Sequence, residues 1–203
     1  RYIDSGAMYR AVTLYALENG LVDDAGNVNT QELAAALPNI RIDFVPQPDG
    51  MQHTILNGRD VEAEIRQLRV SNVVSPVAAI AEVRHRLTAM QQQLGERRGI
   101  VMDGRDIGTT VFPDAELKIY VDASAQTRAQ RRFKEMVEKG SNATYEEVLA
   151  NVMHRDSIDL NRAESPLRRA DDAISLDNSQ MTIEEQDAWL IDKFNGVMEA
   201  LPE

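Results

Sequence analysis

The sequence has no cysteine among its 203 residues. This absence excludes a disulfide framework, a thiolate metal site and a catalytic thiol, and it fits a reducing cytoplasm. Long hydrophobic runs are also missing, because no stretch of about 18 consecutive apolar residues occurs. No leader with a basic and then an apolar segment opens the chain. We therefore expect a cytoplasmic protein that does not span a membrane.

Lysine is scarce, since it accounts for only four of the 22 basic residues and arginine for the others. Arginine presents a planar fork that binds phosphate through two hydrogen bonds, whereas lysine is a single point charge. The excess is consistent with phosphate recognition, although codon bias or exposed helix surfaces explain it equally well. The net charge of −11 argues against binding to a nucleic acid polymer, whose phosphates attract a basic surface.

Short apolar segments alternate with amphipathic segments along the chain. Predicted strands lie at 99–102, 117–121 and 173–176, and each is followed by an aspartate. Predicted helices lie at 5–18, 76–97, 124–140, 144–162 and from 182 onward. Such alternation is typical of βαβ units, so we predict an α/β fold with a parallel sheet flanked by helices.

A second pattern interrupts this alternation. Residues 40–44 alternate between apolar and polar side chains, and 53–56 form another short extended run. Turn signals flank the second run, at 46–50 on one side and at Asn57 and Gly58 on the other. These signals predict a small antiparallel patch that is distinct from the parallel sheet.

Charged residues gather where predicted strands end, which is where parallel sheets bind ligands. In the segment Asp4 to Arg10 a strand end turns into a helix, whose free N–H groups attract an anion within reach of Arg10. The alternative is an ordinary capped helix with a solvated arginine. Strand 99–102 likewise runs into Asp103, Arg105 and Asp106. The alternative there is a charged turn between a strand and a helix.

Two further sets are less specific. Arg155, Asp159 and Arg162 have spacings of four and three, so they share one face of a helix. A ladder of surface salt bridges explains this pattern as well as a binding site does. Ser75 and Arg84 flank the start of the predicted helix 76–97 and by themselves indicate no function.

Taken together, these segments resemble the bacterial cytidylate kinases, a family of nucleoside monophosphate kinases. The shared segments follow in the family's order: DSGAMYR at 4–10, EIR at 64–66, SNVVSPVAA at 71–79, VR at 83–84, DGRDIGTTVFPDA at 103–115 and the run from Arg155 to Ala163. The resemblance extends from residue 2 to about residue 177. It implies a P-loop kinase-like core at 1–31 and 77–203, a small antiparallel CMP-binding insert at 32–76 and a short helical lid at 152–168.

One part of the family pattern is not found. No G-x-x-x-x-G-K-[ST] motif occurs, so the family's first strand and phosphate loop are absent from these 203 residues. We expect about thirty further residues upstream of Arg1 to carry them. The alternative is a protein that does not bind ATP phosphates in the usual way. The chain alone is therefore expected to be nearly inactive as a kinase and to bind CMP only weakly.

The resemblance also implies roles for individual residues. Ser75, Arg84 and Asp106 surround the cytosine base; Asp106 only accepts hydrogen bonds and Arg84 only donates them. Ser5 and Arg10 are expected to contact the phosphate of the substrate. The catalytic residues are expected to be three further arginines that bind phosphate: Arg105, Arg155 and Arg162. Asp159 lies near the sugar and phosphates on the lid, and Asp103 has a supporting role beside the phosphate loop or the magnesium shell.

The implied reaction is transfer of the γ-phosphoryl group of ATP to CMP or dCMP. The acceptor phosphate is already ionised, so catalysis consists of positioning and charge neutralisation, with lid closure excluding water. Mg²⁺ enters with ATP, no side chains form a metal site of their own, and the chain is expected to be a monomer. The alternatives are a catalytically silent nucleotide-binding or scaffold protein and a kinase for another small phosphate acceptor.

Overall fold

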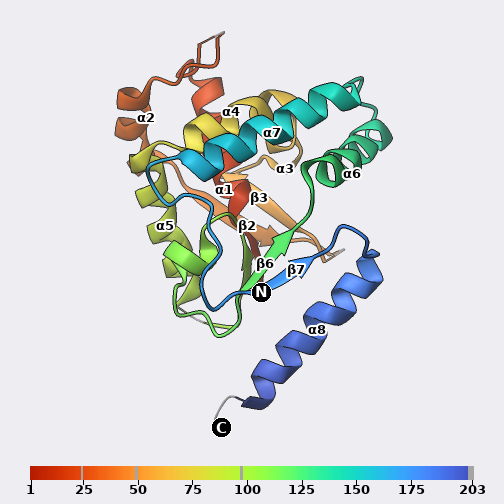
Figure 1. The fold of residues 1–203 in the computed structure, drawn as a ribbon. Coiled ribbons are helices and arrows are strands. Elements are labelled where there is room, and N and C mark those ends of the chain that lie inside the picture. The colour runs from red at the N-terminus through yellow and green to blue at the C-terminus, as the bar shows by residue number, and fades with distance from the viewer. Residues whose placement is uncertain (24, 49, 97, 201–203) are drawn as a thin grey trace.

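Helices surround short strands in the computed structural model, which describes residues 1–23, 25–48, 50–96 and 98–200 (Figure 1). In chain order its elements are β1 (Tyr2–Asp4), α1 (Ser5–Glu18), α2 (Thr30–Ala36), η1 (Leu37–Asn39), β2 (Ile42–Pro46), β3 (Gln52–Leu56), β4 (Arg59–Asp60), α3 (Glu62–Ile65), α4 (Leu68–Ala78), α5 (Ala81–Gly95), β5 (Val101–Asp103), η2 (Ile107–Val111), β6 (Ile119–Asp122), α6 (Ala125–Glu138), α7 (Tyr145–Asn161), β7 (Ile174–Asp177) and α8 (Ile183–Ala200). This arrangement confirms the predicted α/β class.

The strands form two parallel pairs and one antiparallel sheet. β1 pairs with β5, β6 pairs with β7, and β2, β3 and β4 form the antiparallel sheet inside the segment 32–76. In the first pair Asp4 stands opposite Asp103, and in the second Asp122 stands opposite Asp177. In each parallel pair the last residues of the two strands are therefore aspartates that face each other. Their carboxylates lie at the carboxyl end of the strands, which is the edge where parallel sheets bind ligands.

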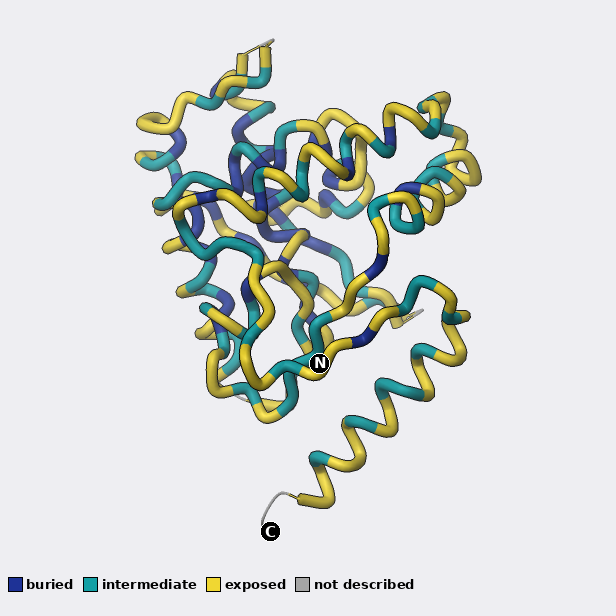
Figure 2. The backbone as a smooth tube through the Cα atoms, viewed as in Figure 1, coloured by how far each residue is buried: buried dark blue, intermediate teal, exposed yellow. Residues whose placement is uncertain are grey.

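The main hydrophobic core surrounds α1 (Figure 2). Burial of this helix against α4, α5 and the antiparallel sheet fixes the turn at its start, where charged residues gather. A second, smaller core lies between α6 and α7, where Ala129 packs against Val148 and Val152. Beside it Phe133 and Tyr145 meet edge to face, with ring centroids 6.1 Å apart. The helix α7 is thus packed on α6 rather than on α1.

Several apolar strand residues are exposed, although the sequence pattern is that of buried strands. Val101, Val121 and Ile174 are 62%, 52% and 40% exposed, because each parallel pair keeps an open edge. The helix α8 buries none of its side chains and projects from the rest of the fold (Figure 2). Within the described ranges, every helix is either too short or too polar to traverse a bilayer.

The predicted long helix over 76–97 is wrong. Its first part belongs to α4, which ends at Ala78, and α5 then covers Ala81–Gly95; residue 97 lies outside the described residues. Pro76 lies in the last turn of α4, and the break between the two helices falls after it, at residues 79 and 80. This break places Ser75 at the end of one helix and Arg84 in the first turn of the next.

Other helix limits agree with the sequence. The predicted helix 5–18 is α1, and the capping box that begins at Thr144 is present at the start of α7. The N-cap of α1 is Asp4, however, and not Ser5, because the Asp4 carboxylate accepts the hydrogen bond from the Ala7 amide at 3.0 Å. The hydroxyl group of Ser5 is thereby free to act elsewhere.

Candidate functional site

A buried ion pair joins α5 to the segment after β5. The guanidinium of Arg84 donates from Nη2 to the carboxylate of Asp106, and from Nη1 to the Ala78 carbonyl at 3.1 Å. The two side chains are 2% and 5% exposed. A buried charge is tolerated only when it is paired, so these two residues form a fixed unit with donors on one member and acceptors on the other.

A second network of hydrogen bonds joins α7 to the segment after β5. The Asp159 carboxylate accepts from Arg105 Nε at 3.0 Å and from Arg162 Nη1 at 3.2 Å. Arg162 also donates twice to the carbonyl of Ser165, at 2.9 and 2.7 Å. The side chains of Asp159 and Arg162 are 5% and 2% exposed. The alternative of a surface salt-bridge ladder is therefore wrong for this helix face.

Ser75 and Arg155 connect α4 with α7. Arg155 Nε donates to Ser75 Oγ at 3.3 Å. Burial, followed by the like charges of Arg105 and Arg132, lowers the pKa of Arg155 to about 10. The contact brings a residue predicted to face the base together with one predicted to bind phosphate.

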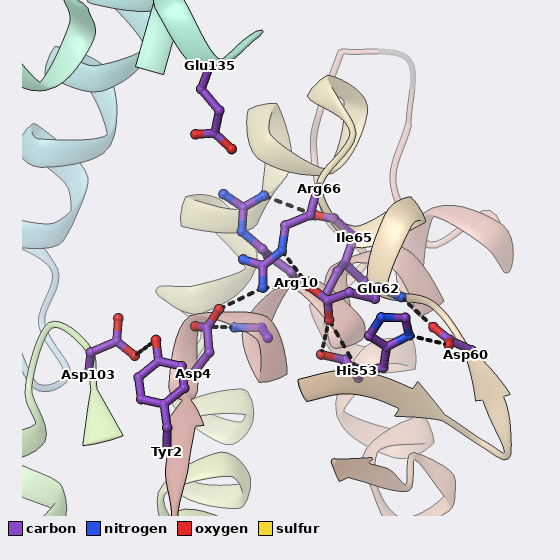
Figure 3. A network of polar contacts seen from close by, with 12 residues as sticks. Tyr2, Asp4, Arg10, His53, Asp60, Glu62, Ile65, Arg66, Asp103 and Glu135 are labelled. Atoms are coloured by element: carbon purple, nitrogen blue, oxygen red, sulfur yellow. Dashed lines mark hydrogen bonds and ion pairs between the residues drawn. The ribbon is translucent and has the colours of Figure 1, made fainter. Parts of the chain in front are cut away.

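The carboxyl ends of β1 and β5 form the next part of the site (Figure 3). Ser5 Oγ donates to the Asp103 carbonyl at 2.6 Å, and the Tyr2 hydroxyl donates to the Asp103 carboxylate at 3.0 Å. Burial and the nearby charge of Asp4 raise the pKa of Asp103. A side chain at Gly104 would collide with Ser5 Oγ, so glycine is needed for this close approach.

Arg10 points from α1 toward the antiparallel sheet and α4 (Figure 3). Its Nη1 donates to the Ile65 carbonyl at 3.0 Å and to Ser71 Oγ at 2.9 Å. Burial, and then the charges of Arg155, Arg132 and Arg66, lower its pKa to about 9. Among the described residues, the groups that accept from Arg10 are a carbonyl and a hydroxyl, so its positive charge is available to an anion.

An arginine-lined pocket lies between α6, α7 and the segment after β5. Its lining residues are Arg105, Arg128, Arg132, Val152, Arg155 and Asp156. Arg128 is paired with Asp156 through contacts of 2.9 and 2.6 Å, whereas Arg132 has no hydrogen-bond or ion-pair partner among the described residues. Burial lowers the pKa of Arg132, and Arg105 lowers it further. Like charges held together in this way attract an anion such as phosphate.

Comparison with known proteins agrees with this geometry. A sequence profile of the cytidylate kinase family matches residues 1–195. The chain belongs to the cytidylate kinase family. Similar proteins include cytidylate kinases of Bacteroides thetaiotaomicron (54% identical over 198 residues), Phocaeicola vulgatus (55% over 198) and Flavobacterium psychrophilum (52% over 197). The alignments cover 97% of this chain, 86% of the first two relatives and 87% of the third.

In this member of the cytidylate kinase family, nine of the ten residues singled out from the sequence contact one another in four groups, and the tenth, Arg10, contacts a different residue. These groups are Arg84 with Asp106, Arg105 with Asp159 and Arg162, Ser75 with Arg155, and Ser5 with Asp103, while Arg10 binds Ser71. Charge interactions link Arg10 to Arg155, and Arg162 to Arg84. The residues therefore belong to one region.

Sequence reasoning missed Arg128 and Arg132. Both lie on α6 and point into the arginine-lined pocket, and their spacing of four places them on one face of that helix. That spacing, together with the excess of arginine over lysine, was the available signal. It was not decisive, because Arg131 on the same helix instead binds the side chain and carbonyl of Asn178.

Proposed function

We propose that this protein transfers the γ-phosphoryl group of ATP to CMP or dCMP, giving CDP or dCDP and ADP. The observation that supports it most strongly is the buried pair of Arg84 and Asp106 beside Ser75 and the phosphate-binding arginines. A base-reading group and a phosphate-binding group are both needed to recognise a nucleoside monophosphate. We place this reaction in the cytoplasm, in pyrimidine nucleotide metabolism, and propose that the chain acts as a monomer.

Recognition of cytosine follows from the hydrogen-bonding capacity of the two buried side chains. Cytosine presents an amino donor and a ring-nitrogen acceptor, which suit the acceptor Asp106 and the donor Arg84. Uracil presents a carbonyl and a ring N–H at the same positions. Its carbonyl oxygen would face the carboxylate of Asp106, where both groups are acceptors, and its N–H would face the guanidinium of Arg84, where both groups are donors. Each such mismatch leaves buried polar groups unpaired, at a cost of about 1–3 kcal/mol.

The arginines supply the other half of the reaction. We propose that Arg10 and Ser5 hold the phosphate of the acceptor, and that Arg105, Arg155 and Arg162 neutralise the group in transfer. The acceptor oxygen is already ionised, so no strong base is required. These arginines are held close together before the anion binds, although their positive charges repel one another. They are therefore already in place to stabilise the negative charge that develops in the transition state.

The residues are also compatible with a divalent cation, which kinases of this kind require, and we propose Mg²⁺. Within the described ranges, no cluster of three or more His, Asp or Glu side chains is arranged to hold a metal ion. We propose that the ion would enter as part of MgATP, and that Asp4 and Asp103, which end the paired strands β1 and β5, would help to orient it there. There it neutralises phosphate charge, while Asp103 keeps its own orientation through Tyr2.

The domain organisation belongs to the same proposal. We assign 32–76 to a CMP-binding insert, 152–168 to a lid, and the rest to the kinase core. The contact between Ser75 and Arg155 supports this division, because it joins the insert to the lid across the site. Closing these two parts over the nucleotides excludes water and so suppresses hydrolysis of ATP.

The direct test is formation of CDP from CMP and MgATP. The assay is run on the 203-residue chain and on an extended enzyme, in which a family segment with a strand and G-x-x-x-x-G-K-[ST] precedes Arg1. We expect CDP from the extended enzyme and little from the 203-residue chain. If the extended enzyme folds but phosphorylates no nucleoside monophosphate, the protein is instead a silent binding protein; if it prefers another acceptor, the base assignment is wrong.

A further inference from the structure

The ring of Tyr9 lies against the guanidinium of Arg84. The Arg84 Cζ is 5.1 Å from the centroid of the ring, which is within the range of a cation–π contact. Tyr9 is 8% exposed and Arg84 is 2% exposed, so water does not screen the contact. Tyr9 comes from α1 and Arg84 from α5, so the interaction joins two helices that are far apart in the sequence.

Hydrogen bonds hold only part of the Arg84 guanidinium. Nη2 binds Asp106 and Nη1 binds the Ala78 carbonyl, but the buried Nε has no hydrogen-bond partner. Two contacts along one edge leave the plane of the group able to tilt about that edge. The face of the Tyr9 ring is the contact that opposes this tilt.

The hydroxyl group of Tyr9 contributes little to the arrangement. It is buried without a hydrogen-bond partner, although the side chain of Gln91 is near enough to lower its pKa. Burial raises the pKa of Tyr9 to about 12, so the side chain is a neutral phenol at physiological pH. The aromatic ring, and not the hydroxyl, is therefore the part that Arg84 uses.

We propose that Tyr9 is a positioning residue for base discrimination: its ring fixes the plane of Arg84, and through Arg84 the carboxylate of Asp106. This inference rests on the proposed function, in which those two side chains read cytosine. Discrimination between cytosine and uracil depends on where the donors and acceptors point. A side chain of similar size without an aromatic face would fill the space but leave the guanidinium free to tilt.

The test compares three variants of the 203-residue chain by calorimetric titration with CMP and with UMP. Tyr9→Leu removes the ring, Tyr9→Phe removes only the hydroxyl, and Tyr15→Leu makes the same change two turns along α1, away from Arg84. We expect the ratio of CMP to UMP affinity to fall by about tenfold in Tyr9→Leu. We expect it to stay within about twofold of the parent chain in the other two variants.

The outcomes separate this inference from the proposed function. If the parent chain itself does not prefer CMP to UMP, the proposed function fails and the role of Tyr9 fails with it. If the parent chain prefers CMP and folded Tyr9→Leu keeps the same preference, only the role of Tyr9 is wrong. Melting curves establish whether each variant folds. If Tyr9→Leu does not fold, Tyr9→Met replaces it, because the flexible apolar side chain of methionine fills the space that the ring leaves. An equal fall of the ratio of CMP to UMP affinity in Tyr9→Leu and Tyr15→Leu would also contradict the role of Tyr9.

Discussion

Ser75 on α4 accepts a hydrogen bond from Arg155 on α7, with 3.3 Å between Oγ and Nε. The two residues are 80 positions apart and have different expected partners, the base for Ser75 and a phosphate for Arg155. We therefore propose that their contact couples a part of the site that reads the base to a part that binds phosphate. We expect binding of the base to alter the affinity for the phosphate. The reason is that a ligand that bonds to Ser75 or to Arg155 either keeps or replaces the hydrogen bond between them.

Removing that hydroxyl gives the first prediction. Ser75→Ala deletes one hydrogen bond to Arg155 and one polar group beside the base, which together account for about 1–2 kcal/mol. We expect the KM for CMP in the extended enzyme to rise about tenfold, while kcat falls less. Steady-state kinetics at saturating MgATP measures both. An unchanged KM would remove Ser75 from the base site.

The second prediction concerns base selectivity. Asp106→Asn replaces an acceptor with a group that also donates, so its amide can bind the carbonyl of uracil. We expect the preference for CMP over UMP, measured as a ratio of kcat/KM, to narrow by about tenfold or more. The change also leaves Arg84 without a charged partner, so melting temperatures accompany the kinetics. A ratio equal to that of the parent enzyme would mean that Asp106 does not face the base.

The third prediction concerns Arg162, which the structure places in the interior. Arg162→Ala removes a partner of Asp159 and both donors to the Ser165 carbonyl. Arg105 still pairs with Asp159, so we expect a loss of about 2 kcal/mol in the free energy of unfolding. We also expect kcat to fall by about a hundredfold or more, because a charge-stabilising donor is lost.

Arg162→Lys separates these two effects. An ammonium group keeps the charge but cannot bind two oxygens in a planar fork, so we expect only partial recovery of kcat. Urea unfolding and steady-state kinetics are measured on both variants. Full turnover in Arg162→Ala, with stability lost, would assign Arg162 to the structure of the lid and not to the reaction.

The fourth prediction uses the unpaired charge of Arg132. Arg132→Gln removes the repulsion from Arg105 and also the attraction of Glu135, so we expect the melting temperature to change little. Pyrophosphate, which binds only the folded protein, is expected to stabilise the parent chain by about 3 kcal/mol at a hundred times its Kd, and the variant much less. Arg131→Gln on the same helix is the matched control, because Arg131 binds Asn178 outside the pocket. Equal stabilisation of all three proteins would exclude Arg132 from anion binding.

Local signals in the sequence account for the elements that were predicted correctly. The Asn19-Gly20 stop signal fixes the end of α1, and the capping box at Thr144 fixes the start of α7. These devices act within a few residues, so no tertiary information is needed to recognise them. The sequence does not decide the N-cap of α1, because Asp4 and Ser5 are both good caps and only the pairing of β1 with β5 decides between them.

Burial of charged side chains could not be predicted in the same way. Arg155, Asp159 and Arg162 have the spacing of a surface ladder, and nothing local distinguishes it from a buried network. Their burial depends on how α7 packs against α4, α6 and the segment after β5. The role of Arg132 depends on the same packing. A pattern on one helix shows which side chains share a face, but the neighbouring elements decide what that face meets.

The most direct test of the account is a competition between two acceptors. The extended enzyme is given MgATP with equal concentrations of CMP and UMP, and the two diphosphates are separated by anion-exchange chromatography while less than a tenth of either acceptor is consumed. The account predicts at least about ten times more CDP than UDP, because uracil leaves buried donors and acceptors mismatched at Arg84 and Asp106. Equal amounts of CDP and UDP, or an excess of UDP, would contradict it.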